Sequence, residues 1–265
     1  MQPFERKPSY DIHDLVEIVR LLRAPGGCPW DIEQTHTSLR SGLIEETYET
    51  VDAIDKGSAA MLKEELGDVL LQVVFHAQIE TENSVFDFDD VCDGICKKLL
   101  YRHPHVFSTQ EDGIKTPEQV LEKWDKLKDA EKDIHTAAQD IAAVPAALPA
   151  LMRARKVLKR AARHGFTWPD AAAALPDLEE ELAELRQAMQ HPQDKETLAA
   201  EYGDALLSLT NLGRLLDLEA EQALTDATAR FADRLQKVER EILAQGSQME
   251  ERSPEELLAA WEAAK

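Results

Sequence analysis

The stretch LIEETYETVDAIDKGSAAMLKEELGDVLL, residues 43–71, decides the fold, because acidic residues recur in it at helical spacing on both sides of a Gly-Ser pair. At about 100° per residue, Glu45, Glu46 and Glu49 share one face of a helix. The opposite face is apolar and consists of Ile44, Tyr48, Val51 and Ile54. The Gly-Ser pair ends this helix, and a second helix follows as far as about Glu82. The sequence therefore predicts an α-helical hairpin.

The second helix differs from the first because apolar residues surround its two central acids, Glu65 and Asp68. We therefore expect both acids to be buried. A carboxylate in an apolar interior must be protonated, paired with a cation or bound to a metal. Few Lys or Arg residues lie in register with these two acids. Two helices that offer carboxylate oxygens to one place suit Mg²⁺, which prefers octahedral oxygen ligands and often binds substrate phosphates. The pattern predicts phosphate chemistry with Mg²⁺ as the cofactor.

Nearly the same pattern returns between residues 178 and 207. Its acids are Glu180, Glu181, Glu184, Glu201 and Asp204. Each copy is followed by two basic residues one helical turn apart, and then by a Trp and a Lys four residues apart. In the first copy these are Lys98, Arg102, Trp124 and Lys128, and in the second they are Arg230, Arg234, Trp261 and Lys265. A solvated acidic face explains one such string but not its repetition with the same companions.

Helical periodicity fills most of the remaining chain, and no alternating strand pattern occurs. In the first copy, helices are predicted from Asp11 to about Arg23, from Asp87 to Pro104, and from Thr116 onward. In the second copy they are predicted at about 149–163, 177–190, 195–216, 219–245 and 254–264. We therefore predict an all-α protein with two tandem helical domains, each with a four-helix core. The expected domains are residues 1–130 and 149–265, joined by a linker over residues 131–148.

Composition narrows the function further. The formal net charge of −21 argues against broad contact with nucleic acid or with an anionic membrane. A basic helix over residues 153–160 is the exception, and we interpret it as bound to acids of the same chain or solvated. The apolar runs are much shorter than the roughly 18 residues typical of a membrane span, and residues 1–24 lack the layout of a signal peptide. We therefore expect a cytoplasmic protein.

The two motifs EETYE with EELGD and EEELAE with AEYGD resemble the EExxE and ExxD signature of MazG-type nucleoside triphosphate pyrophosphohydrolases. The flanking segments CPWD, RHPHVF and GFTWP are similar to that family as well, and the resemblance covers nearly the whole chain in the tandem arrangement. It implies an all-α homodimer that hydrolyses a nucleoside triphosphate to the monophosphate and pyrophosphate with Mg²⁺, in nucleotide-pool housekeeping.

The resemblance also implies roles for individual residues. The metal ligands would be Glu46, Glu49, Glu65 and Asp68 in the first copy, and Glu181, Glu184, Glu201 and Asp204 in the second. Because tandem relatives usually hydrolyse with the downstream copy, the catalytic set would be those four second-copy acids with Glu180. Phosphate and base would contact Arg230, Arg234, Trp261 and Lys265, and also Lys98, Arg102 and Lys128 if the first copy is active. Relatives often carry Lys and Glu at the positions of Asp177 and Ala200.

Two other interpretations stay open at this stage. The first is a non-catalytic acidic helical scaffold or regulatory adaptor that keeps the fold without turnover. The second is a ferritin-like di-iron bundle, which requires Glu-x-x-His on two core helices. Only Glu33 with His36 matches that requirement, and it lies near a predicted turn. We therefore disfavour the di-iron bundle.

Overall fold

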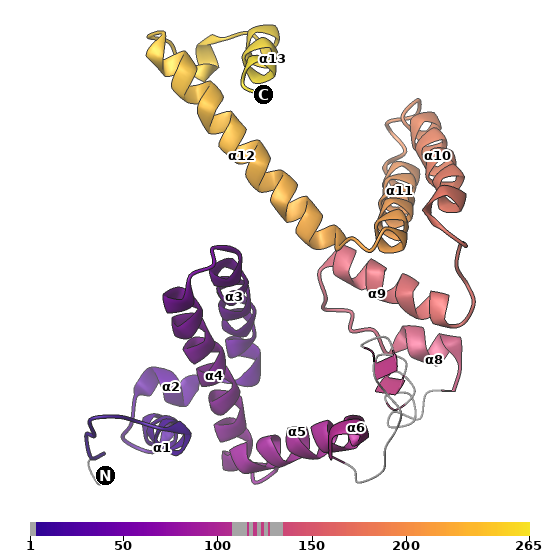
Figure 1. Ribbon diagram of the computed structural model, residues 1–265. Helices are drawn as coiled ribbons and strands as arrows, with labels where there is room; N and C mark the ends of the chain where they lie inside the picture. The colour runs from indigo at the N-terminus through magenta and orange to yellow at the C-terminus, as the bar shows by residue number, and fades with distance from the viewer. Residues whose placement is uncertain (1–3, 108–115, 117–118, 121–122, 125–126, 128–134) are drawn as a thin grey trace. The chain divides into compact units, whose positions relative to one another are not determined.

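The computed structural model describes residues 4–107, 116, 119–120, 123–124, 127 and 135–265 (Figure 1). Every regular element among these residues is a helix, which confirms the predicted all-α class. The chain divides into two compact units, Met1–Trp124 and Asp125–Lys265. Each unit contains one copy of the acidic motif. In the described part of the chain, no helix combines the length and the apolar character needed to cross a membrane.

The first unit contains six described helices. They are α1 (Ile12–Arg23), α2 (Pro29–Glu33), α3 (His36–Asp55), α4 (Ala59–Glu82), α5 (Phe88–Arg102) and α6 (Pro104–Phe107). Asp11 caps α1 as predicted, and its carboxylate accepts hydrogen bonds from the backbone N–H groups of His13 and Asp14. Gly57, with a φ of 62°, lets the chain reverse between α3 and α4. The predicted helical hairpin is therefore α3 with α4.

The core of this unit lies where α1 packs against the beginning of α3 and the C-terminal half of α4. Its buried residues are Val19, Leu39, Val74, Phe75 and Ile79. Arg23 stabilises the same region. Its guanidinium donates two hydrogen bonds to Glu82, at 2.9 and 2.8 Å, and further hydrogen bonds to the backbone carbonyls of Asp31 and Gln34. The core therefore fixes one end of the hairpin, and the acidic residues lie beyond it toward the Gly57 turn.

The second unit repeats the hairpin. Its described elements are α8 (Ala137–Ala142), α9 (Ala150–Arg163), α10 (Ala171–Ala188), α11 (Lys195–Leu215), α12 (Ala220–Ala244), the 3₁₀ helix η1 (Met249–Glu251) and α13 (Pro254–Ala263). The α10–α11 hairpin packs against α9, and α12 contacts both α9 and α11. In the first unit α4 contacts α1, α3 and α5, and in the second unit α11 contacts α9, α10 and α12.

Two elements differ from the prediction. The helix expected from residue 177 begins at Ala171, because Asp170 caps it and Pro176 is accommodated inside it with the loss of one backbone hydrogen bond. Part of the stretch predicted as a linker forms α8, whose Asp140 is buried against α9. The helix predicted from Thr116 onward falls mostly outside the described residues, as does Lys128. The domain bounds stay a prediction.

The basic residues of α9 bind acids of their own unit. Arg155 Nη1 lies 2.8 Å from Glu219, and Arg160 Nη1 lies 3.2 Å from Asp140 Oδ1. The intramolecular role expected for the basic helix is therefore confirmed for these two residues.

Candidate metal centre

The first acidic cluster lies between α3 and α4. Glu46, Glu49 and Glu65 each place one carboxylate oxygen within 4.8 Å of the others, although they come from two helices. Spacing along α3 puts Glu46 and Glu49 on one side of it, and the antiparallel hairpin brings Glu65 opposite Glu49. Asp68 is close enough to act electrostatically on Glu46. The structure therefore brings together three of the four acids predicted as first-copy metal ligands, and Asp68 lies next to them.

These carboxylates repel one another. Partial burial, followed by the charges of Asp68 and Glu49, raises the pKa of Glu46 above its ordinary value. Partial burial, followed by the charge of Glu49, likewise raises the pKa of Glu65. A divalent cation at this place would relieve both effects, because it offers the positive charge that the cluster lacks.

The second copy repeats this arrangement between α10 and α11. Glu181, Glu184 and Glu201 place carboxylate oxygens within 4.8 Å of one another. Partial burial and the charge of Asp204 raise the pKa of Glu181, and partial burial and the charge of Glu184 raise the pKa of Glu201. Glu180, which was predicted to be catalytic, is exposed beside this cluster. Both copies therefore form the same acidic centre.

The burial of these acids differs from the prediction. Glu65 and Asp68 were expected to be buried, but both are only half-buried. The reason is that their apolar neighbours are themselves uncovered, since Leu66 is 51% exposed and Leu70 is 39% exposed. In the second copy, Asp204 is exposed.

The donor set fits a magnesium ion. An octahedral Mg²⁺ with oxygen ligands at about 2.1 Å places neighbouring ligands about 3 Å apart and opposite ligands about 4 Å apart. Oxygens within 4.8 Å of one another reach that geometry with small side-chain movements. The set is all carboxylate, without the imidazole or thiolate that zinc favours. Glu46, Glu49, Glu65 and Asp68 would hold the ion in the first copy, and Glu181, Glu184, Glu201 and Asp204 in the second.

The basic residues predicted to bind phosphate lie on other helices. Lys98 and Arg102 are on α5, which begins beyond the C-terminal end of α4, whereas Asp68 lies roughly 20 Å back along that helix at 1.5 Å per residue. In the second unit, α12 leaves the C-terminal end of α11 and diverges from the α10–α11 hairpin (Figure 1). Within one copy, the structure therefore does not bring Arg230 or Arg234 to the acids.

The C-terminal residues form a cluster of their own. The guanidinium of Arg234 lies 4.0 Å from the centre of the Trp261 ring and donates a hydrogen bond to the Trp261 carbonyl. Phe231 packs on the same ring with centroids 4.8 Å apart. Lys265 pairs with Glu262, and Arg230 is exposed on α12. Trp261, predicted to stack on a base, thus stacks on Arg234, which is itself predicted to bind phosphate.

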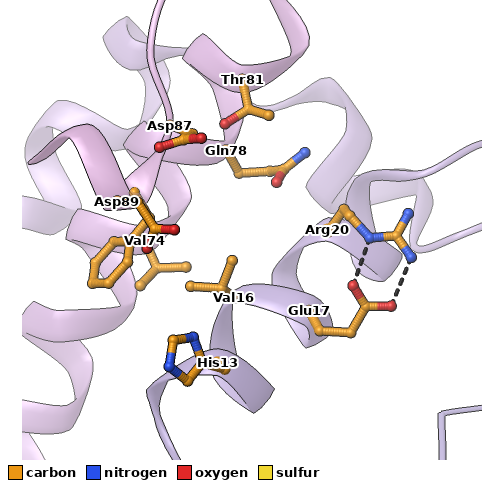
Figure 2. Close-up of a pocket in the computed structure, with 10 residues that line it drawn as sticks. His13, Val16, Glu17, Arg20, Val74, Gln78, Thr81, Asp87 and Asp89 are labelled. Atoms are coloured by element: carbon orange, nitrogen blue, oxygen red, sulfur yellow. Dashed lines mark hydrogen bonds and ion pairs between the residues drawn. The ribbon is translucent and has the colours of Figure 1, made fainter.

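A separate pocket of about 260 Å³ lies between α1, α4 and the start of α5 (Figure 2). Val16 and Val74 form part of its apolar lining, and Gln78 lines it from α4. Glu17 and Arg20 are joined there by two hydrogen bonds of 2.6 Å. None of the residues that line this pocket belongs to the acidic cluster of the same unit.

Fold and site together define a class of protein, an all-α chain in which a duplicated helical hairpin carries a carboxylate centre suited to a divalent cation. Residues 34–107 match the model of the MazG nucleotide pyrophosphohydrolase domain. The chain is 42% identical over 252 residues to the nucleoside triphosphate pyrophosphohydrolase/pyrophosphatase MazG of Thermotoga maritima, covering 95% of this chain and 94% of that protein. It is 40% identical to the nucleoside triphosphate pyrophosphohydrolase of Escherichia coli K12, with 96% and 97% covered. The chain belongs to the MazG family.

Proposed function

We propose that this protein is a Mg²⁺-dependent hydrolase that converts a nucleoside triphosphate and water to the monophosphate and pyrophosphate. The observation that carries the proposal is the carboxylate centre, which corresponding glutamates form once in each of the two hairpins. The names of the relatives support the reaction, since both full-length relatives are called nucleoside triphosphate pyrophosphohydrolases. We further propose that the enzyme acts in the cytoplasm on the nucleotide pool.

The acidic residues would act on the metal ion and the basic residues on the phosphates. When bound, Mg²⁺ would neutralise phosphate charge and polarise the phosphorus under attack. The carboxylates would hold the ion, and one of them would orient the attacking water. The basic side chains would stabilise the charge that develops on the phosphate oxygens, and an Arg is well suited to this because it binds phosphate bidentately.

We also propose that the enzyme acts as a homodimer. The apolar face of α3, opposite its acids, is uncovered: Ile44 is 50% and Tyr48 51% exposed. The second hairpin is similar, with Leu182 49% and Tyr202 57% exposed. A second copy of this chain has complementary apolar faces and would cover them. It would also supply basic helices near the acids, which neither unit does by itself.

Product identification tests the reaction. Incubation of a panel of nucleoside triphosphates with Mg²⁺ should yield monophosphate and pyrophosphate by ion-exchange chromatography. Diphosphate with orthophosphate as the main products would refute the proposed bond cleavage. Absence of turnover with every base would instead favour the scaffold or adaptor interpretation.

Subunit mixing tests the dimer. A chain with Glu201→Gln lacks a second-copy ligand, and a chain with Arg230→Ala and Arg234→Ala lacks the basic pair. If the basic pair acts on the partner's acids, mixing the two inactive chains restores activity in the heterodimer. If both sets act within one chain, the mixture stays inactive although light scattering still shows dimers.

A further inference from the structure

The facing sides of α3 and α4 meet in layers about one helical turn apart. The acidic layers are Glu49 with Glu65, whose carboxylate oxygens lie within 4.8 Å of each other, and Glu46 with its neighbour Asp68. One turn closer to the core, Gly42 faces Gln72, and a Cβ built on Gly42 would lie 3.2 Å from Gln72 Nε2. The following layer, Leu39 with Phe75, is part of the apolar core. Gln72 is therefore the polar residue between the metal centre and the core.

The amide of Gln72 carries a buried oxygen, Oε1, for which the described part of the chain provides no hydrogen-bond donor. A buried acceptor without a donor destabilises the native state, so such groups are rare and call for a partner. A water molecule held between the two helices would supply the missing donor.

The neighbouring acids cannot be that partner once they bind a cation, because an ionised carboxylate only accepts hydrogen bonds. A hydrated Mg²⁺ can be that partner, because the ion keeps several water ligands at about 2.1 Å and these waters donate hydrogen bonds. A water ligand followed by a hydrogen bond of about 2.8 Å spans roughly the 5.4 Å that separates adjacent layers of the hairpin.

We infer that Gln72 is a positioning residue of the first metal centre, where its amide oxygen accepts a hydrogen bond from a water molecule of the hydrated magnesium ion. The inference rests on the proposed function, since it requires that the first copy binds Mg²⁺. Gly42 makes the arrangement possible, because a larger residue at that position would displace the amide. Gln72 acts on the ion through its water and does not touch it.

The second copy lacks this feature. The register that sets Glu181 beside Asp204 places Asp177 opposite Ser208 at the equivalent layer. Asp177 is charged and Ser208 is short, so neither reproduces the neutral amide of Gln72. The two metal centres therefore share their carboxylates and differ in the group that holds the ion's hydration shell.

The test uses the full chain with Glu201→Gln, which removes a ligand of the second centre and leaves the first as the site measured. Mg²⁺ is titrated by calorimetry, and Mn²⁺ by water-proton relaxation, which reports the waters held by the ion. Gln72→Met keeps the length of the side chain and removes the acceptor. We expect it to weaken Mg²⁺ binding roughly tenfold, as changes of this kind around metal ligands do. Gln78→Met on the same helix is the matched control, because Gln78 pairs with Glu82 and faces the other pocket.

Gly42→Ala provides a second route that leaves Gln72 in place. It should push the amide aside and weaken Mg²⁺ binding, while the metal-free melting temperature stays equal or rises because Ala favours a helix more than Gly. If Gln72 has only a structural role, Gly42→Ala should instead lower the melting temperature and leave the Mg²⁺ affinity unchanged. The inference about Gln72 would be overturned, and the proposed metal centre kept, if the parent and Gln72→Met bind Mg²⁺ equally. The same holds if Gln78→Met loses as much affinity as Gln72→Met. Absence of saturable binding in the parent would overturn the first metal centre itself.

Discussion

Glu184 on α10 and Glu201 on α11 face each other across the second hairpin with carboxylate oxygens within 4.8 Å of each other, although both are acids. Such a pair holds a proton more tightly than either acid does alone, because the second negative charge is unfavourable beside the first. The same relationship joins Glu49 and Glu65 in the first hairpin. Each hairpin therefore has a place where either protons or a metal ion reduce the repulsion.

The first prediction concerns the dependence of stability on pH and Mg²⁺. Glu46, Glu65, Glu181 and Glu201 have a raised pKa in the folded state. Their contribution to stability is complete below the ordinary value of 4.5 and is lost as pH rises through the folded-state pKa. The melting temperature without metal should fall over this window, and Mg²⁺ should restore it, more strongly at about pH 7.5 than at pH 5.

Melting scans in a chelator and in millimolar Mg²⁺ measure this effect. Glu201→Gln is the control, because it removes one of the repelling charges. In this variant both the pH slope and the gain from Mg²⁺ should be smaller. A melting temperature at pH 7.5 that is the same with and without Mg²⁺ would contradict the prediction.

The second prediction concerns His76. Its ring stacks on His36, with the two Nδ1 atoms 2.7 Å apart, while His36 Nε2 lies 2.5 Å from Glu80. Burial and then the charge of His36 lower the pKa of His76. The neutral form is thus favoured in the folded state, so its stabilising contribution is present above 6.5 and is lost as pH falls through the folded-state pKa. A proton NMR titration should place the His76 midpoint below 6.5, and a midpoint above that value would refute the prediction.

Much of this fold could be predicted because helix ends are encoded locally. Asp11, Gly57 and Asp194 specify where helices begin or end, and the structure agrees within a residue or two. The acids of each hairpin could be grouped for a related reason, since spacing on two antiparallel helices joined by a short turn fixes which residues face each other.

Burial and helix direction could not be predicted in the same way. The half-buried state of Asp68 depends on whether another surface covers Leu66, and helical periodicity does not contain that information. The course of α12 after its turn likewise decides whether Arg230 reaches the acids. Gln72 was missed, although a signal existed: it lies one turn after Asp68 on the mostly apolar face of α4.

The third prediction concerns Asp140, which anchors α8 to α9. Asp140 is 1% exposed, and its carboxylate lies 3.2 Å from Arg160, 3.6 Å from Arg163 and 3.3 Å from His164. Asp140→Ala leaves these cations without their shared partner, and we expect a loss of about 3 kcal/mol in the free energy of unfolding. Asp93→Ala is the matched control, because Asp93 also lies in a helix, is exposed and pairs with Lys97 at 2.5 Å. Its cost in urea denaturation should be much smaller because the pair is exposed to solvent, and equal losses in the two variants would contradict the assignment.

The last prediction identifies the copy that performs turnover. Both copies have the four acids, so a difference in their activity must come from the groups that bind and orient the triphosphate. The second copy is followed by two arginines and the first by Lys98 and Arg102; an Arg binds phosphate bidentately, whereas a Lys does not. We therefore expect Asp204→Asn, which removes a metal-binding charge with little change of shape, to abolish kcat at saturating Mg²⁺, and Asp68→Asn to reduce it much less. The reverse result would make the first copy catalytic, and a loss of about half in each variant would mean that both copies hydrolyse substrate.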